Sequence, residues 1–286
     1  MIRPVDVLLE FLEAEQARGV SHVHLDQGAR DGLRQLFNQA RPGAKTAAPE
    51  LPARVEMPVE TPLPPAVSVS MDLKIEGKSR EDKLAGLRHQ AENWAPARAL
   101  GTLRETMVFS TGSPEARVML IGEAPGYQDE KERQPFAGPA GQKLNDILKA
   151  MGLSREDVYL ANIVKFRPST PKQTTNNRRP TPAEMTACMP FLRAEIAVIQ
   201  PQCVIALGET TAEGLLGLSG HISTMRGSWH DFEGTPVRVT YHLSHLLQTS
   251  GGNQTKRLLW EDMLSVMEKI DLPISAKQRG FFLPKP

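Results

Sequence analysis

Four short apolar segments alternate with helical patterns along most of the chain, and this alternation restricts the fold more than any other feature. The apolar segments occupy residues 117–121, 158–164, 203–208 and 236–242. They are rich in β-branched residues and nearly continuous in hydrophobicity, which is typical of parallel strands buried on both faces. Because helices connect parallel strands, the sequence predicts an α/β fold with three layers, α/β/α, around a central four-stranded parallel sheet.

Polar residues and one glycine mark helix ends in this pattern. Ser79 with Asp82, and Thr181 with Glu184, have the spacing of a capping box, in which each side chain bonds the other residue's backbone N–H. Gly152 follows an amphipathic segment, and glycine readily takes the left-handed conformation of a helix C-cap. The sequence therefore predicts helices that begin after Ser79 and Thr181, and one that ends at Gly152.

Composition divides the chain into four parts. Residues 1–40 contain two short helical patterns, whereas residues 41–72 are rich in Pro, Ala and Glu without periodicity, which predicts an extended linker. Residues 73–272 hold the strand–helix alternation and form the predicted α/β domain. Residues 273–286 form a C-terminal tail.

Charge, cysteine content and hydropathy exclude several classes of protein. The formal net charge is +1, so contacts with nucleic acid have to come from local patches. The two cysteines, Cys188 and Cys203, lie in apolar segments, which excludes a disulfide framework and a four-cysteine metal site. No apolar run approaches the roughly 18 residues that a membrane helix needs. We expect a monomer in the cytoplasm.

Three polar residues follow predicted strands at the edge where ligands bind in parallel sheets. Glu123 comes after the first strand, Asn162 lies near the end of the second, and His242 ends the last. Each alone has an ordinary structural explanation: a helix cap, a turn or a hydrogen-bonded core histidine. Together with a glycine-rich loop and the isolated Phe136, they predict an active site.

Five motifs in order carry a resemblance to a known family. They are GEAPG…PFAGPAG, NIVKFRP, RPTPAEMTACMPFLRAEIAVIQP, VIALG and YHLSHLL…WEDM. Over about residues 80–268 the chain resembles the uracil-DNA glycosylase superfamily, most closely its fourth family, the iron–sulfur type. The resemblance implies a monofunctional DNA glycosylase, a hydrolase that flips a base out of DNA and cleaves its N-glycosidic bond to leave an abasic site.

The resemblance also implies roles for the residues around the cavity. Glu123 would orient water and stabilise positive charge on the sugar, and His242 would donate a hydrogen bond to O2 of the departing base. Phe136 would stack on the base and Asn162 would bind its Watson–Crick edge. Small residues would let the nucleotide come close: Gly122, Ala124, Gly126 and Gly138.

The segment after His242 is expected to contact DNA. In the resembling family, side chains here wedge into the space that the flipped base leaves. Leu246 is the predicted wedge and Ser244 a predicted phosphate ligand. The alternative is that Leu246 and Leu247 only begin a buried helix.

The chain departs from the family at the iron–sulfur cluster. The family holds the cluster with four cysteines, and only Cys188 remains in this sequence, with Phe166 in place of the third. Such a cluster needs about four ligands. We therefore expect no metal and no cofactor, with Trp94 and Phe166 packing in the region of the cluster.

Two further departures concern substrate choice. The pair Asp129–Glu130 reverses the family's order, so the side chain expected to crowd C5 of the base is one methylene shorter. The segment 167–179 is longer than expected and contains Arg167, Lys172, Arg178 and Arg179 without an acid. A basic loop of this kind is predicted to contact DNA phosphate or groups on an enlarged base.

Three hypotheses about function remain open at this point. The first is excision of uracil during base-excision repair. The second is excision of a bulky C5-modified pyrimidine, such as the glucosylated hydroxymethylcytosine of phage DNA, in antiviral defence. The third is a DNA-binding module without catalysis. The preference for single- or double-stranded DNA and the role of residues 1–40 stay undetermined.

The tail also has two interpretations. Phe281 and Phe282 would be a solubility liability if fully exposed, so one hypothesis is that they fold back onto the domain. The other is that Gln278–Phe282 resembles the short peptides with which repair enzymes bind sliding clamps.

Overall fold

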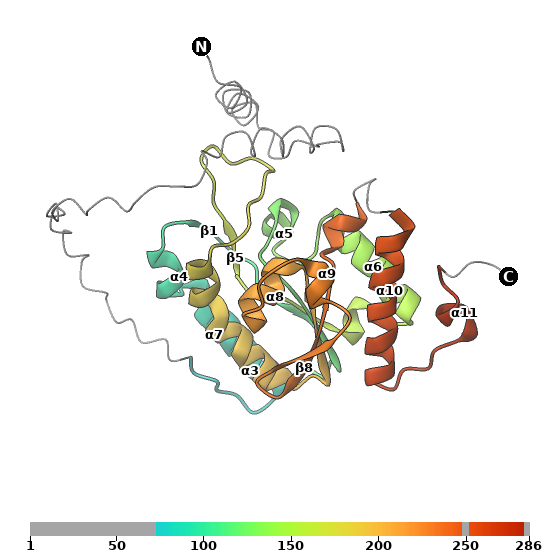
Figure 1. Cartoon of the computed structure of the whole chain (residues 1–286). Helices are drawn as coiled ribbons and strands as arrows, with labels where there is room; N and C mark the ends of the chain where they lie inside the picture. The colour runs from blue at the N-terminus through green and yellow to red at the C-terminus, as the bar shows by residue number, and fades with distance from the viewer. Residues whose placement is uncertain (1–72, 248–251, 283–286) are drawn as a thin grey trace, which may run out of the picture. The chain divides into compact units, whose positions relative to one another are not determined.

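The computed structural model describes residues 73–247 and 252–282 (Figure 1). The predicted helical segment 1–40 and the predicted linker 41–72 lie outside the described residues, as do residues 283–286 of the tail. Within the described part no helix is both long and apolar enough to cross a membrane.

A six-stranded mixed sheet forms the centre of the domain, in the order β2-β4-β3-β6-β8-β7. Its four inner strands are mutually parallel, as the sequence predicts, and the edge strands β2 and β7 run antiparallel to their neighbours. The inner strands are β4 (Tyr159–Asn162), β3 (Val118–Gly122), β6 (Cys203–Leu207) and β8 (Thr235–Thr240), and the edges are β2 (Thr111–Gly112) and β7 (Trp229–Phe232).

Alternate residues of the inner strands face two separate cores, because side chains in a strand alternate between its faces. On β3, Met119 and Ile121 pack with one core, and Val118 and Leu120 pack with the other. All five residues of β3 and of β6 are buried. Burial on both faces explains why the sequence reads as continuous apolar runs, and it confirms the predicted three layers.

Helices cover both faces of the sheet (Figure 1). The core with Ile121 includes residues of α3 (Arg80–Glu92), α4 (Ala95–Ala99), α7 (Pro182–Ile199), α8 (Glu209–Leu216) and α9 (Ile222–Met225). The core with Leu120 includes residues of α6 (Pro139–Met151) and α10 (Gly252–Lys269). Short elements complete the domain: α5 (Tyr127–Glu132), η1 (Arg155–Asp157) and η2 (Leu243–Leu246).

The predicted helix ends are confirmed. Ser79 with Asp82, and Thr181 with Glu184, form complete capping boxes at the starts of α3 and α7. Gly152 is the left-handed C-cap of α6, with φ of 81°. Local side-chain chemistry therefore places these boundaries without help from the rest of the fold.

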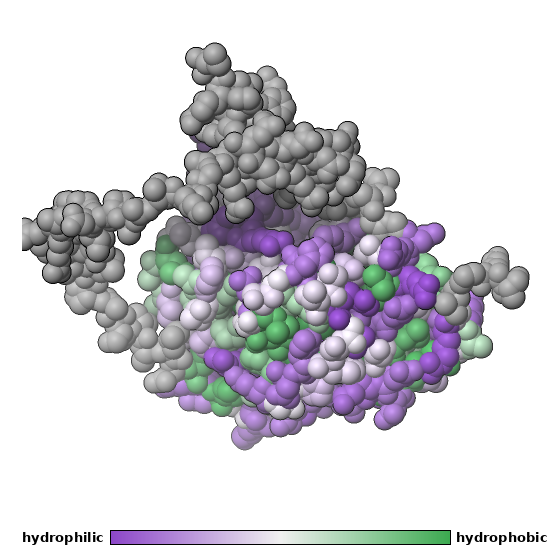
Figure 2. Space-filling view, viewed as in Figure 1, coloured by the Kyte–Doolittle hydropathy of each residue, from purple (hydrophilic) through white to green (hydrophobic). Residues whose placement is uncertain are grey.

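A separate two-stranded antiparallel sheet pairs β1 (Leu103–Met107) with β5 (Phe166–Pro168). In the chain, β5 follows β4 and leads into the loop of residues 169–180, hereafter the polar loop. On the face seen in Figure 2, hydrophobic residues of the described domain occur in separate groups between hydrophilic ones.

The tail packs on the domain as far as it is described. Its short helix α11 (Ala276–Arg279) begins with a capping box between Ser275 and Gln278. The Trp260 indole Nε1 donates to the carbonyl of Gln278 at 2.8 Å, and the Gln278 amide donates to the carbonyl of Ala150 at 2.8 Å. Phe281 lies 5.2 Å from the Trp260 ring, centroid to centroid, so the hypothesis that the tail folds back holds for this residue. Phe282 stays 45% exposed.

Candidate active site

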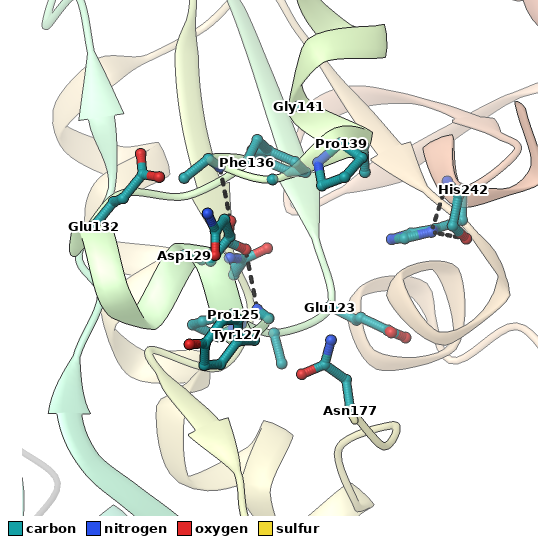
Figure 3. A pocket seen from close by; sticks show the side chains of 18 of the residues that line it. Glu123, Pro125, Tyr127, Asp129, Glu132, Phe136, Pro139, Gly141, Asn177 and His242 are labelled. Carbon is teal, nitrogen blue, oxygen red and sulfur yellow. Dashed lines mark hydrogen bonds between the residues drawn. The ribbon is translucent and has the colours of Figure 1, made fainter. Parts of the chain in front are cut away.

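A cavity of about 650 Å³ opens beyond the carboxyl ends of β3 and β4. It is lined by Glu123, Phe136, Asn162 and His242, the residues that the sequence predicts to meet there. Figure 3 shows Glu123 and His242 on one side of the cavity, and Tyr127, Asp129 and Glu132 on the other. The volume falls within the range of about 300–1,000 Å³ typical of ligand pockets.

Glu123 is the first residue after β3, and its backbone carbonyl accepts a hydrogen bond from Val164 N at 3.0 Å. This bond continues the pairing of β3 with the chain beyond β4 and fixes where the side chain starts. Among the described residues the carboxylate makes no hydrogen bond, and it also lines a smaller neighbouring cavity of about 140 Å³. A half-buried carboxylate so placed is available to a substrate or a water molecule.

His242 lies just beyond β8, as the N-cap of η2, rather than at the end of the strand as the sequence predicts. Its Nδ1 atom lies 3.3 Å from the backbone N of Ser244 and 2.7 Å from Ser244 Oγ. A backbone N–H can only donate, so Nδ1 accepts and the proton of the neutral ring resides on Nε2. Burial lowers the pKa of His242, and the negative charge of Glu123 opposes that change. The site thus holds a neutral imidazole with an N–H to donate.

Phe136 and Asn162 are buried side by side against Gly122. A Cβ atom on Gly122 would lie 2.4 Å from Asn162 Oδ1 and 3.0 Å from Phe136 Cζ, so only glycine fits between them. The expectation that Gly122 contacts DNA is therefore corrected, because it is buried against these two side chains. Gly126, Gly138 and Ala124 line the cavity, and their contact with a nucleotide stays a prediction.

A buried ion pair holds the backbone of Asn162 in place. Lys165 Nζ lies 2.5 Å from Glu195 Oε2, and both side chains are fully buried. The same ammonium group donates to the carbonyl of Asn162 at 3.0 Å and to Ser110 Oγ at 3.0 Å. The charge thus fixes the backbone from which the Asn162 amide projects into the cavity.

Arg167 is not free to bind phosphate, which corrects the expectation for it, whereas Arg178 is ion-paired but only half-buried and lines the cavity, so its contact with DNA stays a prediction. Arg167 is buried and pairs with Glu130 at 2.9 Å, while also donating to the carbonyls of Thr174 and Asn176. Arg178 pairs with the buried Glu184 at 2.6 Å. Both guanidinium groups hold the polar loop together from inside.

The other two basic residues have exposed side chains. Lys172 is exposed on the polar loop and is not among the residues that line the cavity. Arg179 lines the smaller cavity together with Glu123 and His242, and its guanidinium lies 3.6 Å from Glu209. Contact of these two residues with DNA stays a prediction.

The structure disfavours Leu246 as the predicted wedge. Leu246 is half-buried and packs against the core that contains α10, whereas Leu247 is 45% exposed and lines the cavity. The turn of η2 directs the first toward the core and leaves the second exposed, and a wedge in this segment stays a prediction. Ser244 also lines the cavity, but its hydroxyl lies within hydrogen-bond distance of His242.

Asp129 lines the cavity, yet both of its carboxylate oxygens accept backbone hydrogen bonds. Oδ2 accepts from Gly126 N at 3.0 Å and Oδ1 from Ala137 N at 2.7 Å (Figure 3). Sequence reasoning did not name several lining residues, and the signal for the two in the polar loop was the unusual length of that loop. They are Tyr127, Gln128, Glu132, Pro139, Thr175 and Asn177.

The residues in the region of the expected cluster do not fit a four-cysteine iron–sulfur site. The chain has two cysteines, and Cys188 and Cys203 pack in different cores. Burial raises the pKa of the Cys188 thiol to about 11 and that of Cys203 to about 12, which opposes the thiolate that a metal needs. As predicted, Trp94 and Phe166 are buried in the core that holds Cys188. Trp94 packs edge-on against Phe191, and the Arg98 guanidinium lies over the Phe166 ring.

Sequence comparison identifies relatives of this chain. The profile of the Uracil DNA glycosylase superfamily matches residues 109–264. A type-4 uracil-DNA glycosylase of Thermotoga maritima is 38% identical over 162 residues, which cover 56% of this chain and 81% of that protein. One from Pyrobaculum aerophilum is 35% identical over 153 residues, 51% of this chain and 75% of that protein. A type-5 uracil-DNA glycosylase of Thermus thermophilus is 31% identical over 180 residues, 54% of this chain and 75% of that protein.

Proposed function

Because the chain belongs to the uracil DNA glycosylase superfamily, whose members are monofunctional DNA glycosylases, we propose that it excises uracil from DNA and leaves an abasic site. The observation that carries this proposal is the single cavity lined by Glu123, Phe136, Asn162 and His242. An aromatic ring, an amide, an imidazole and a carboxylate are the groups needed to stack, read and release a pyrimidine.

The base has to leave the duplex before these groups can reach it. In the cavity its ring stacks on Phe136, and the exposed Leu247 fills the vacated space in the helix. The Asn162 amide donates to O4 of uracil and accepts from N3–H, because an amide offers both a donor and an acceptor. Lys165 Nζ donates to the backbone carbonyl of Asn162, and this bond holds the backbone that carries the amide.

Bond cleavage separates charge between the sugar and the base. As the bond between C1′ and N1 breaks, its electrons move onto the base, and His242 Nε2–H donates to O2, where negative charge gathers. The Glu123 carboxylate stabilises the positive charge on the sugar and orients a water molecule. The water oxygen then bonds to C1′, and its proton passes to the carboxylate and on to solvent.

The direct test is cleavage of duplex and single-stranded oligonucleotides that carry one uracil. Alkali breaks the strand at an abasic site, so the expected result is a cut at uracil and none at thymine or cytosine. Binding without strand breakage on any substrate would favour the hypothesis of a non-catalytic DNA-binding module instead.

A specific observation supports a second candidate, excision of a bulky C5-modified pyrimidine such as glucosylated hydroxymethylcytosine. C5 and C2 lie opposite one another in a pyrimidine ring, so a base whose O2 meets His242 directs C5 toward the far side of the cavity. Figure 3 shows α5 on that side, and polar side chains of α5 and of the polar loop line the cavity, among them Gln128 and Asn177. These side chains suit the hydroxyl groups of a sugar.

The substitution Asn162→Asp separates the two candidates. A carboxylate facing O4 of uracil loses the donor and repels the carbonyl, so uracil excision should fall severely. A cytosine-type base presents an amine there, which a carboxylate accepts from, so excision of a cytosine derivative should fall far less. Equal losses on both substrates would remove this discrimination.

We further propose that catalysis proceeds without an iron–sulfur cluster, since the chain has two cysteines where the cluster needs about four. The test is iron analysis of purified protein together with its visible absorption. Iron at one atom or more per chain would overturn this proposal.

A further inference from the structure

Phe136 has a backbone conformation that a bulky residue rarely adopts. Its φ is 56°, in the left-handed region, where the side chain crowds the backbone. The ring is nevertheless 7% exposed and lines the cavity, so it is held in one place. Such conformations persist only when the surroundings fix them, and they concentrate at functional sites.

Arg155 fixes the carbonyl side of this residue. Its Nη2 atom donates to the carbonyl of Phe136 and its Nη1 atom donates to the carbonyl of Pro135 at 3.2 Å. The third donor, Nε, bonds Asn145 Oδ1 at 2.7 Å, which ties the guanidinium to α6. One planar group thus joins two consecutive carbonyls to a helix.

The first turn of α6 also approaches the Phe136 carbonyl closely. A Cβ atom on Gly141 would lie 1.6 Å from the Phe136 oxygen and 2.8 Å from Arg155 Nη2. Glycine at this position is therefore required for the arginine and the carbonyl to meet.

Asp129 bonds the N–H of the same peptide group whose carbonyl Arg155 bonds. Its Oδ1 atom accepts from the backbone N–H of Ala137, the residue directly after Phe136, at 2.7 Å. Its Oδ2 atom accepts from Gly126 N at 3.0 Å, which ties the same carboxylate to the start of α5. The peptide group after Phe136 is therefore held by two side chains of opposite charge, Arg155 at its carbonyl and Asp129 at its N–H, and Arg155 also bonds the carbonyl of the group before it.

We propose that Asp129 and Arg155 are positioning residues, a clamp that holds the Phe136 ring where the extruded base stacks. The proposal deepens the proposed function and rests on it for the role of the ring. It assigns Asp129 a different task from the one expected from sequence, which was to crowd C5 of the base. Neither clamp residue touches the reacting atoms.

The activity test is a double-mutant cycle on cleavage of a duplex that carries uracil, under single-turnover conditions. Arg155→Met should lower the rate on the order of tenfold, because small displacements of a substrate-positioning group are costly. In a Phe136→Ala background the same substitution should change the rate less than about twofold, since the ring is already gone. Arg155→Lys, which can bond one carbonyl, should recover part of the loss.

Arg117→Met is the matched control. Arg117 also donates to a backbone carbonyl, that of Ile270 at 2.7 Å, but it does not line the cavity. This control should leave the cleavage rate unchanged. An equal loss from Arg155→Met with and without the Phe136 ring would overturn the clamp.

Asp129→Asn distinguishes the clamp from a C5 gate. A clamp predicts that excision of uracil falls several-fold and that the ratio of uracil to thymine-mismatch cleavage stays the same. A gate predicts that uracil excision is kept while thymine cleavage rises, and this result would overturn the clamp.

Hydrogen exchange supplies a readout that needs no activity. The amide of Ala137 should exchange slowly in the unmodified protein and on the order of tenfold faster in Asp129→Asn. Slow exchange in a protein that cleaves no base would reject the proposed function while upholding the clamp geometry. Equally slow exchange in the variant would reject the clamp itself.

Discussion

The two walls of the cavity are built in different ways. The Phe136 wall, residues 136–141, consists of one ring followed by small residues, and two charged side chains bond the peptide group that follows the ring. The polar loop, residues 169–180, is held from inside by Arg167 and Arg178, while Asn177 is exposed at the cavity. The first arrangement fixes a surface for stacking, which every pyrimidine shares. The second leaves hydrogen-bonding side chains free to differ between substrates.

The largest effect should come from breaking the buried ion pair that holds the backbone of Asn162, between the two walls. Lys165→Met leaves the fully buried Glu195 without its partner, and breaking a buried ion pair costs about 3–5 kcal/mol in the free energy of unfolding. Urea denaturation measures this change. The control is Lys143→Met, whose exposed pair with Asp146 should contribute less than about 1 kcal/mol. Similar losses in both variants would mean that burial of the pair is unimportant.

Loss of either proposed catalytic residue, Glu123 or His242, should nearly abolish base excision, whichever part of the cavity recognises the base. Glu123→Ala and His242→Ala should each lower the cleavage rate about a hundredfold or more, roughly 2.7 kcal/mol of transition-state stabilisation. DNA affinity should change little, because phosphate contacts dominate it. Single-turnover cleavage and a binding titration test the two parts, and a rate like that of the unmodified protein would refute the assignment.

Removing the Asn177 side chain from the polar loop should affect the two candidate substrates differently, because only the larger base is expected to contact this loop. The Asn177 amide oxygen accepts from Arg167 Nε at 2.9 Å, which leaves the NH₂ group to donate elsewhere. Asn177→Ala should leave uracil excision within about twofold and weaken excision of a C5-glycosylated pyrimidine several-fold, the usual scale for one hydrogen bond. The two cleavage rates are compared in one experiment. An equal loss on both bases would show that the loop does not select substrates.

The smallest predicted effect is on the protonation of His242. Its pKa is lowered from 6.5 by burial, so the ring is neutral above pH 6.5 and gains a proton only as the pH falls below that value. The unfolded chain then binds more protons than the folded one, so the free energy of unfolding declines as the pH falls below 6.5. Glu123→Gln removes the charge that opposes this shift and should lower the pKa further. An NMR titration of the imidazole measures it, and an upward shift would contradict the proposed coupling.

Much of the fold could be predicted because its signals are local. The inner strands are apolar on both faces, and capping boxes such as Ser79–Asp82 need only three residues of spacing. The edge strands were missed for the same reason. β2 has two residues, and β7 alternates exposed with buried positions too briefly to form a pattern.

The site was predictable only where the strand ends determine it. Glu123 and Asn162 follow from the topology, since parallel strands bring their carboxyl ends together. The orientation of Arg167 into the polar loop depends on Glu130, a residue 37 positions earlier, and no local pattern contains that contact. The burial of Leu246 and the exposure of Leu247 follow from the turn of η2, where one residue separates the core from the surface.

Docking of the tail on the domain lowers the affinity of any partner that binds the same tail residues. The Gln278 side chain bonds both Ser275 and Ala150, and the Phe281 ring packs on Trp260. A sliding clamp that uses these same groups can bind only the fraction of molecules whose tail has left the domain. If about one molecule in a hundred is undocked, the apparent affinity is about a hundredfold weaker than that of the isolated tail peptide. The intramolecular contacts therefore act as a competitive ligand at fixed concentration, and weakening them raises the affinity of the whole protein for such a partner.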